Sequence, residues 1–91
     1  MEFEWDGDKA ANNLAKHGVA FSEASTVFFD PLSLTQYDPD HSDDEDRYIT
    51  MGVSAEGKLL LVSHTDRENR IRIISARRAS RRDRKAYENE Q

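Results

Sequence analysis

The chain has 91 residues, 36% hydrophobic and 34% charged, with a formal net charge of −5 and no cysteine. This length predicts one domain, residues 1–91, with a core too thin to enclose a large cofactor, and the lack of cysteine excludes disulfide scaffolds and thiolate zinc sites. Because the first residues lack the features of a signal peptide and no apolar run approaches the roughly 20 residues of a membrane helix, we expect a cytoplasmic protein without a membrane partner.

Charge is segregated along the chain. Residues 1–66 contain four basic and 14 acidic side chains, a net charge of −10, whereas residues 67–91 contain nine basic and four acidic side chains, a net charge of +5. Such asymmetry indicates an anionic or acidic partner more strongly than the average charge does. It predicts where that partner binds but not which partner it is.

The N-terminal part predicts a short strand followed by a helix. Residues 3–5 alternate apolar and polar side chains, as a strand does. Asp6 can cap a helix over residues 7–17, and Gly18 stands where a C-cap glycine belongs. The expected apolar face of this helix carries Ala10, Ala11 and Leu14. At 100° per residue, a shared polar face carries Lys9, Asn13, Lys16 and His17.

A second helix should begin at Ser22 as its N-cap. It should end at Asp30, because the residue before Pro31 avoids the helical region. Its expected buried stripe is Ala24, Val27 and Phe28. Residues 32–37 predict a short strand, and residues 38–46 predict an acidic loop.

Three strands and a last helix complete the chain. Alternation and turn residues predict strands over 48–53, 58–65 and 70–74, joined by turns at 54–57 and 66–69. Ser80 and Asp83 form a capping-box pattern that opens the last helix. Short antiparallel strands with helices at both ends indicate an α+β domain.

The basic segment from residue 70 to residue 87 is the most informative part of the sequence. Arg70 and Arg72 should lie on one strand face about 7 Å apart, which suits consecutive phosphates. Four cations crowd the start of the last helix and oppose its dipole: Arg81, Arg82, Arg84 and Lys85. This placement indicates RNA or an acidic partner. The alternative is that the arginines pair with the protein's own acidic loop.

Three side chains could move protons. His17 lies at a helix end beside Lys16, where a neutral imidazole could act in strand cleavage or could simply stabilise the last helical carbonyls. His64 could share a face with Arg72 or could be a structural histidine. The Tyr87 hydroxyl could be catalytic, or the ring could be the hydrophobic anchor of a polar helix.

The acidic loop does not match a calcium site. It lacks the required glycine, and the twelfth position counted from Asp38 is Ile49 rather than Glu. We expect a solvated loop, or a phosphate mimic that shields the arginines. The sequence contains no glycine-rich phosphate loop, nucleophile elbow or metal-binding His pair, so no metal site and no cofactor are expected. Trp5, which follows a strand, is expected in the core.

Taken together, these residues resemble the BrnT family of toxins over nearly the whole chain. In the first half the resemblance lies in residues 3–6, Lys9, Asn13, residues 16–19, Phe21 and residues 23–24, 27–28 and 30–31. In the second half it lies in Glu45, residues 47–48, Gly52, Arg67, residues 72–77 and 81–82, Arg84 and Tyr87. The specific part is the combination of Lys16-His17-Gly18 with Ile73-Ile74-Ser75-Ala76-Arg77.

The resemblance implies a fold like that of the RelE ribonucleases, with a small antiparallel sheet and two N-terminal helices. It implies an RNA-cleaving toxin that arrests translation and is neutralised by a BrnA-type antitoxin. DNA would be contacted only indirectly, through the antitoxin. Cleavage in this superfamily generally needs no metal: the ribose 2′-OH attacks the adjacent phosphorus and leaves a cyclic phosphate.

With that chemistry, Arg72 and Arg77 are the expected phosphate ligands. His17 is the first candidate for proton transfer, with Tyr87 and His64 behind it. The expected RNA-binding residues are Lys16, Arg67, Arg70, Arg81 and Arg82.

Two other classes of function compete with this prediction. A non-catalytic module could bind an acidic partner through its basic end, as could an inactive toxin that acts only through its antitoxin complex. A DNA-binding repressor fits less well, because the last helix offers almost no base-reading side chains.

Overall fold

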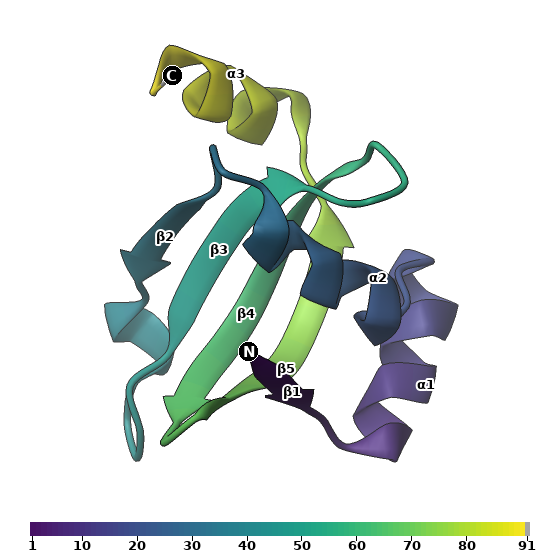
Figure 1. Cartoon of the computed structure of the whole chain (residues 1–91), viewed down its shortest axis with the longest axis vertical. Coiled ribbons are helices and arrows are strands. Elements are labelled where there is room, and N and C mark those ends of the chain that lie inside the picture. Colours follow the sequence, from purple (N-terminus) through teal and green to yellow (C-terminus); the bar gives the residue numbers. More distant parts are fainter. Residues whose placement is uncertain (91) are drawn as a thin grey trace.

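The structure is a computed structural model, and it describes residues 1–90. Figure 1 shows one twisted sheet with helices beside it and at one end. In chain order the elements are β1 (Glu2–Glu4), α1 (Gly7–His17), α2 (Phe21–Ser25), η1 (Thr26–Phe29), β2 (Leu34–Tyr37), η2 (Pro39–His41), β3 (Tyr48–Val53), β4 (Leu59–Arg67), β5 (Arg70–Arg78) and α3 (Arg81–Asn89). The expected α+β class is confirmed.

The sheet has five strands in the order β1-β5-β4-β3-β2. The strands from β2 to β5 pair antiparallel, as expected for short connections. The first strand instead pairs parallel with β5, from Glu2 opposite Arg70 to Glu4 opposite Arg72. Because β1 is so short, the second half of β5 has no strand partner at that edge.

The predicted bounds of α1 and the predicted start of α3 are confirmed, whereas the predicted start of α2 is wrong. The Asp6 carboxylate accepts a hydrogen bond from the Asp8 N–H, and Gly18 closes α1 in the left-handed region at φ 70°. The capping box of Ser80 and Asp83 is present. The expected N-cap at Ser22 is wrong: Ala20 is the N-cap, no side chain caps the helix, and α2 begins at the buried Phe21.

One face of the sheet is covered by α2 and η1, which cross it in Figure 1. The core lies between these layers and consists of Val19, Phe21, Ala24, Val27, Leu60, Val62, Ile73 and Ala76. A Cβ at Gly52 would lie 2.9 Å from Val27 Cγ1, so this strand position has room only for glycine beneath η1.

Two expectations about the N-terminal residues are wrong. Trp5 is 38% exposed rather than buried in the core, and its ring makes an edge contact with Phe21. In α1, Leu14 is 52% exposed whereas Asn13 is buried, so the predicted places of these two side chains are wrong, although Ala10 packs against the core as expected. The helix lies along the open edge of β5, where a polar side chain can satisfy backbone groups that an apolar side chain would leave unpaired.

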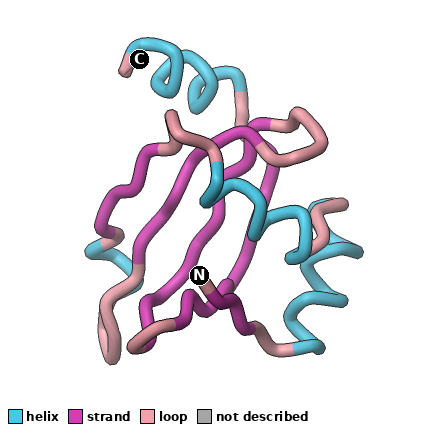
Figure 2. The backbone as a smooth tube through the Cα atoms, in the orientation of Figure 1, coloured by secondary structure: helices cyan, strands magenta, loops and turns pink. Residues whose placement is uncertain are grey.

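The opposite face of the sheet is largely open, with α3 over one end. Figures 1 and 2 show α3 at one end of the sheet and the acidic loop after β2 at the other. No helix among residues 1–90 is long and apolar enough to cross a membrane.

Candidate functional site

Asn13 fixes α1 against the unpaired half of β5. Its amide nitrogen donates to the carbonyls of Val19 and Ala76, each at 2.9 Å, and its oxygen accepts from the Ala76 N–H at 3.1 Å. The side chain thus replaces a missing neighbouring strand and satisfies both backbone groups of Ala76. As a consequence, the C-terminal end of α1 lies beside the open face of β5.

The open face is built from two rows of side chains that run across four strands. Because residues paired in register share a face, one row is Leu34, Met51, Leu61 and Arg77, and the next is Gln36, Ile49, Ser63 and Ser75. At the β5 end, both rows are polar. Ser63 pairs with Ser75 and His64 pairs with Ile73, so Ile74 forms a bulge that changes the direction of β5 just before Ser75.

His17 and Arg77 both line a pocket at this polar end. The pocket has a volume of about 90 Å³, and its other walls are Ser63, Ser75, Ile49, Leu61 and Ala76. The histidine comes from α1, the arginine and the Ser75 hydroxyl come from β5, and the Ser63 hydroxyl comes from β4. The structure therefore brings together a candidate proton carrier, a permanent cation and two hydrogen-bonding hydroxyls.

A second hollow, of about 210 Å³, continues from this pocket along α1. It shares His17 and Ser75 with the pocket and adds Lys9, Lys16 and Asn12. Both lysines lie on the predicted polar face of α1. The combined surface is basic, although the whole chain is acidic.

Arg77 is held in place by the start of α3. Its Nη1 atom donates to Asp83 Oδ2 at 2.9 Å, and the same oxygen accepts from the N–H and the hydroxyl of Ser80. The Ser80 N–H, followed by Arg77, lowers the pKa of the Asp83 carboxyl. The Arg77 side chain is 48% exposed, so it is oriented by Asp83 yet accessible.

Arg72 lies on β5 at a distance from this pocket. Its Nη1 atom donates to Glu4 Oε2 at 2.9 Å, and Arg70 lies 3.7 Å from the other oxygen of Glu4. The hydrogen bond from Arg72 lowers the pKa of the Glu4 carboxyl. Five residues along a strand span about 16 Å, so the backbone positions of Arg72 and Arg77 lie well apart, and Arg77 lines the pocket whereas Arg72 does not.

The remaining predicted RNA-binding arginines lie outside the pocket. Arg67 pairs with Glu45 of the acidic loop at 3.3 Å, as the alternative of internal pairing predicts for this one residue. Arg81 and Arg82 are exposed on α3 and form no ion pair with a described residue. Helical spacing directs them away from Tyr87, the buried side of α3.

His64 lies in the core beneath the helices. It is 3% exposed, and its Nε2 atom lies 2.8 Å from Thr50 Oγ1. The Nδ1 atom lies 3.4 Å from Asp66 Oδ1 without the geometry of a hydrogen bond. Burial lowers the pKa of the imidazole, an effect that Asp66 partly offsets. These contacts fit the structural alternative for His64.

Tyr87 anchors α3 to Asp30, the residue that caps η1. Its hydroxyl donates to Asp30 Oδ2 at 2.8 Å, and that carboxylate also accepts from the N–H groups of Leu32 and Val53. Burial and the Asp30 charge raise the pKa of the Tyr87 hydroxyl. A buried, occupied hydroxyl outside the pocket fits the anchor alternative for this residue.

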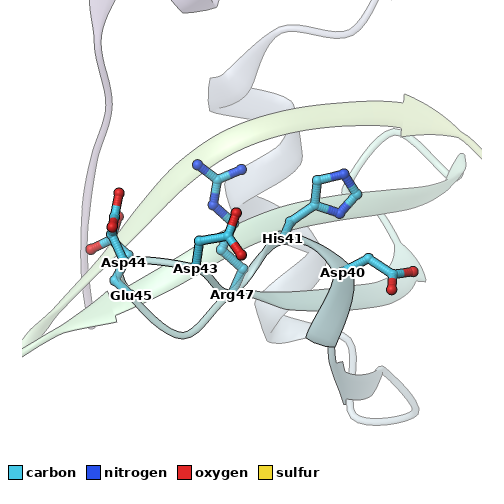
Figure 3. A pocket seen from close by; sticks show the side chains of 6 residues that line it. All are labelled: Asp40, His41, Asp43, Asp44, Glu45 and Arg47. Carbon is cyan, nitrogen blue, oxygen red and sulfur yellow. The ribbon is translucent and has the colours of Figure 1, made fainter.

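The acidic loop forms a hollow of about 200 Å³ at the far end of the sheet. It is lined by Asp40, His41, Asp43, Asp44, Glu45 and Arg47. Figure 3 shows these side chains spread along the loop. Within residues 1–90, no group of three or more His, Asp or Glu side chains is arranged to hold a metal ion.

Sequence reasoning missed the two serines of the pocket, Ser63 and Ser75. Single serines in strands are common, so only knowledge of the register reveals that they pair with each other and flank Arg77. The nearest signal in the sequence was that each serine interrupts an apolar run, Ser63 after Leu59-Leu60-Leu61-Val62 and Ser75 after Ile73-Ile74.

Comparisons with known proteins agree with this architecture. A family model described as the ribonuclease toxin BrnT of type II toxin–antitoxin systems matches residues 5–83. The fold is similar to the 1.1 Å crystal structure of the ribonuclease toxin BrnT from Brucella abortus, with a TM-score of 0.64 and 24% identity over 89% of this chain and 99% of that one. Among curated protein sequences, none matches significantly.

Proposed function

Because the chain belongs to the BrnT family of ribonuclease toxins of type II toxin–antitoxin systems, we propose that it cleaves RNA in the pocket between His17 and Arg77. The observation that carries this proposal is that α1 and β5 contribute a histidine and an arginine to one open hollow. Both residues were candidates on sequence grounds alone, and they are 60 positions apart in the chain.

The proposed reaction is an internal transesterification. The ribose 2′-OH attacks the adjacent phosphorus while its proton passes to the His17 imidazole. The bond from phosphorus to the 5′ oxygen breaks, and that oxygen takes up a proton. The products are a 2′,3′-cyclic phosphate and a 5′-hydroxyl end.

Arg77 stabilises the charge that develops on the phosphoryl oxygens. A permanent cation, held by Asp83, supplies this stabilisation without a metal ion, so we propose that cleavage is metal-independent. Ser63 and Ser75 can donate hydrogen bonds to the same oxygens. Lys9 and Lys16 bind neighbouring phosphates along α1.

The other cations extend the RNA path beyond the pocket. Arg70 and Arg72 lie further along β5, where Glu4 keeps them oriented until RNA competes for them. Arg81 and Arg82 offer exposed charge on α3. Arg67 should contribute least to RNA binding, since it already pairs with Glu45.

A toxin of a type II system has an antitoxin partner, and we propose that this partner is of the BrnA type. It would neutralise the toxin and would carry any contact with DNA. Cleavage would take place in the cytoplasm, where messenger RNA is translated, and would arrest translation.

The test is RNA cleavage by the purified chain in excess EDTA. A 5′-labelled RNA should yield fragments with 2′,3′-cyclic phosphate ends, and expression without antitoxin should stop growth and degrade total RNA. Arg77→Ala and His17→Ala should each lower the cleavage rate by about 100-fold or more.

Two variants serve as matched controls. Arg78→Ala removes the neighbouring arginine, which belongs to the other face of the sheet through its pairing with Leu60. His41→Ala removes an exposed histidine of the acidic loop. Both should cleave like the wild type. If the folded wild type leaves RNA intact, the chain is a binding module or an inactive toxin instead.

A further inference from the structure

The open face of the sheet also holds an apolar hollow, which lies next to the proposed cleavage pocket on the side away from α1. Its volume is about 210 Å³, and its floor is made by Leu34, Ile49, Met51 and Leu61. Ile49 and Leu61 also line the pocket of His17 and Arg77, so the two spaces share a wall. We propose that this hollow binds one unstacked RNA base beside the cleaved phosphate; this inference rests on the proposed function.

The order of side chains along the rows supports this assignment. From Arg77 the first row leads to Leu61 on β4 and then to Met51 on β3. Strands lie about 4.8 Å apart, so the apolar surface begins one strand away from the phosphate ligand. A nucleotide whose phosphate contacts Arg77 can therefore lay its base on Leu61 and Met51.

Charge distinguishes the hollow from the pocket beside it. The pocket and its extension along α1 contain His17, Arg77 and two lysines. Among the described residues, the lining of the apolar hollow contains no cation, and its edge includes Asp83 of α3 and the C-cap residue Glu90. Carboxylates repel a phosphate but accept hydrogen bonds from the amino groups of cytosine, adenine or guanine.

Gln36 supplies a polar edge on the opposite side. It stands at the β2 end of the second row and lines the hollow next to Ile49. An amide can donate and accept at once, which suits the edge of an exposed base. Apolar walls with a few placed polar groups are typical of sites for small planar ligands.

An antitoxin side chain is the competing occupant of this hollow. Two features favour a base. The hollow shares a wall with the pocket in which Arg77 would bind the phosphate of the same nucleotide, and its carboxylates can accept hydrogen bonds from the amino groups of a base. The response of a methyl group in the hollow to RNA and to antitoxin distinguishes the two occupants.

The chain contains only two methionines, Met1 and Met51, so 13C-methyl methionine labelling gives one reporter in the hollow and one outside it. The probes are short 2′-O-methylated RNAs of cytosine, adenine or uracil, which lack the attacking hydroxyl. We expect the Met51 methyl signal to shift and saturate while the Met1 signal stays in place. Inorganic phosphate alone should leave Met51 unshifted.

Gln36→Ala should weaken binding of the preferred RNA about two- to tenfold, the effect of one lost hydrogen bond, and reduce the difference between bases. Asn69→Ala, an exposed amide on the turn between β4 and β5, is the matched control and should bind like the wild type. RNA that binds by fluorescence polarisation without shifting Met51 would overturn the base site alone. A Met51 shift that antitoxin causes and RNA does not would also overturn the base site. If the wild-type chain bound none of the RNAs, the proposed function would be overturned as well.

Discussion

At the scale of single residues, Asn13 has the largest predicted effect on stability. Replacing it with Ala leaves three buried backbone groups without partners: the carbonyls of Val19 and Ala76 and the Ala76 N–H. A buried group that loses its hydrogen bond costs about 1–3 kcal/mol. We expect Asn13→Ala to lower the free energy of unfolding by about 2–4 kcal/mol, measured by urea denaturation.

The neighbouring Asn12→Ala variant is the control for this measurement. Asn12 is exposed and has the same side chain, so its replacement should change stability by no more than about 0.5 kcal/mol. Equal effects of the two substitutions would show that the contact between α1 and β5 contributes little.

His64 gives the protein a predictable response to acid. Burial lowers the pKa of this imidazole below the value of 6.5 expected for the unfolded chain. Between those two values the unfolded state binds the proton more tightly. The stabilising contribution is therefore complete above pH 6.5 and is lost as pH falls towards the folded-state pKa.

We expect urea midpoints to fall between pH 7.5 and pH 5.5, and expect His64→Gln to reduce this dependence. Glu4, Asp30 and Asp83 do not interfere, because their lowered pKa values place their effects below pH 4.5. His41→Ala should keep the slope of the wild type. An unchanged slope in His64→Gln would contradict the assignment.

At the scale of elements, α3 depends on two polar anchors for its position. Tyr87 ties its second half to Asp30, and Asp83 ties its first turn to Arg77. Tyr87→Phe removes one hydrogen bond to a carboxylate, worth about 1.5–3 kcal/mol. We expect faster amide exchange throughout α3 and unchanged exchange in the core strands.

The same variant tests how α3 acts on the site. Because Asp83 orients Arg77, a loosened α3 should reduce RNA cleavage less than Arg77→Ala does. Unchanged exchange in α3 would mean that the helix is held by apolar contacts, with the hydroxyl contributing little.

Local sequence signals sufficed for most of these elements. Asp6, Gly18 and the Ser80–Asp83 pair act within a few residues of themselves, so their caps could be predicted from neighbours in the chain. Strand alternation likewise predicted β3 and β4 closely. What local signals could not reveal was pairing between distant segments.

The site illustrates this difference. His17 and Arg77 could be chosen by residue type, but their shared pocket depends on Asn13 binding to Ala76, 63 positions away. The helical pattern made Asn13 look solvent-facing, because periodicity registers apolar contacts and not an unpaired strand edge. For the same reason, Leu14 was wrongly expected to be buried.

At the scale of the whole molecule, the net charge of −5 opposes RNA binding, whereas the surface around the pocket favours it. The acidic loop lies at the end of the sheet away from α3 (Figure 2), which keeps most of its charge away from the cations of that helix. RNA binding should therefore depend on local cations and should weaken steeply with salt.

Each phosphate contact on single-stranded RNA adds about 0.7 to the slope of log affinity against log salt. Contacts from Arg77, Lys9 and Lys16 alone predict a slope of about −2. Arg77→Ala should make that slope shallower by about 0.7, whereas Arg78→Ala should affect it less. Fluorescence polarisation between 50 and about 300 mM salt measures both values. A salt-independent affinity would mean that the basic surface does not hold the RNA backbone, because no arrangement of exposed cations can bind phosphates without releasing counterions.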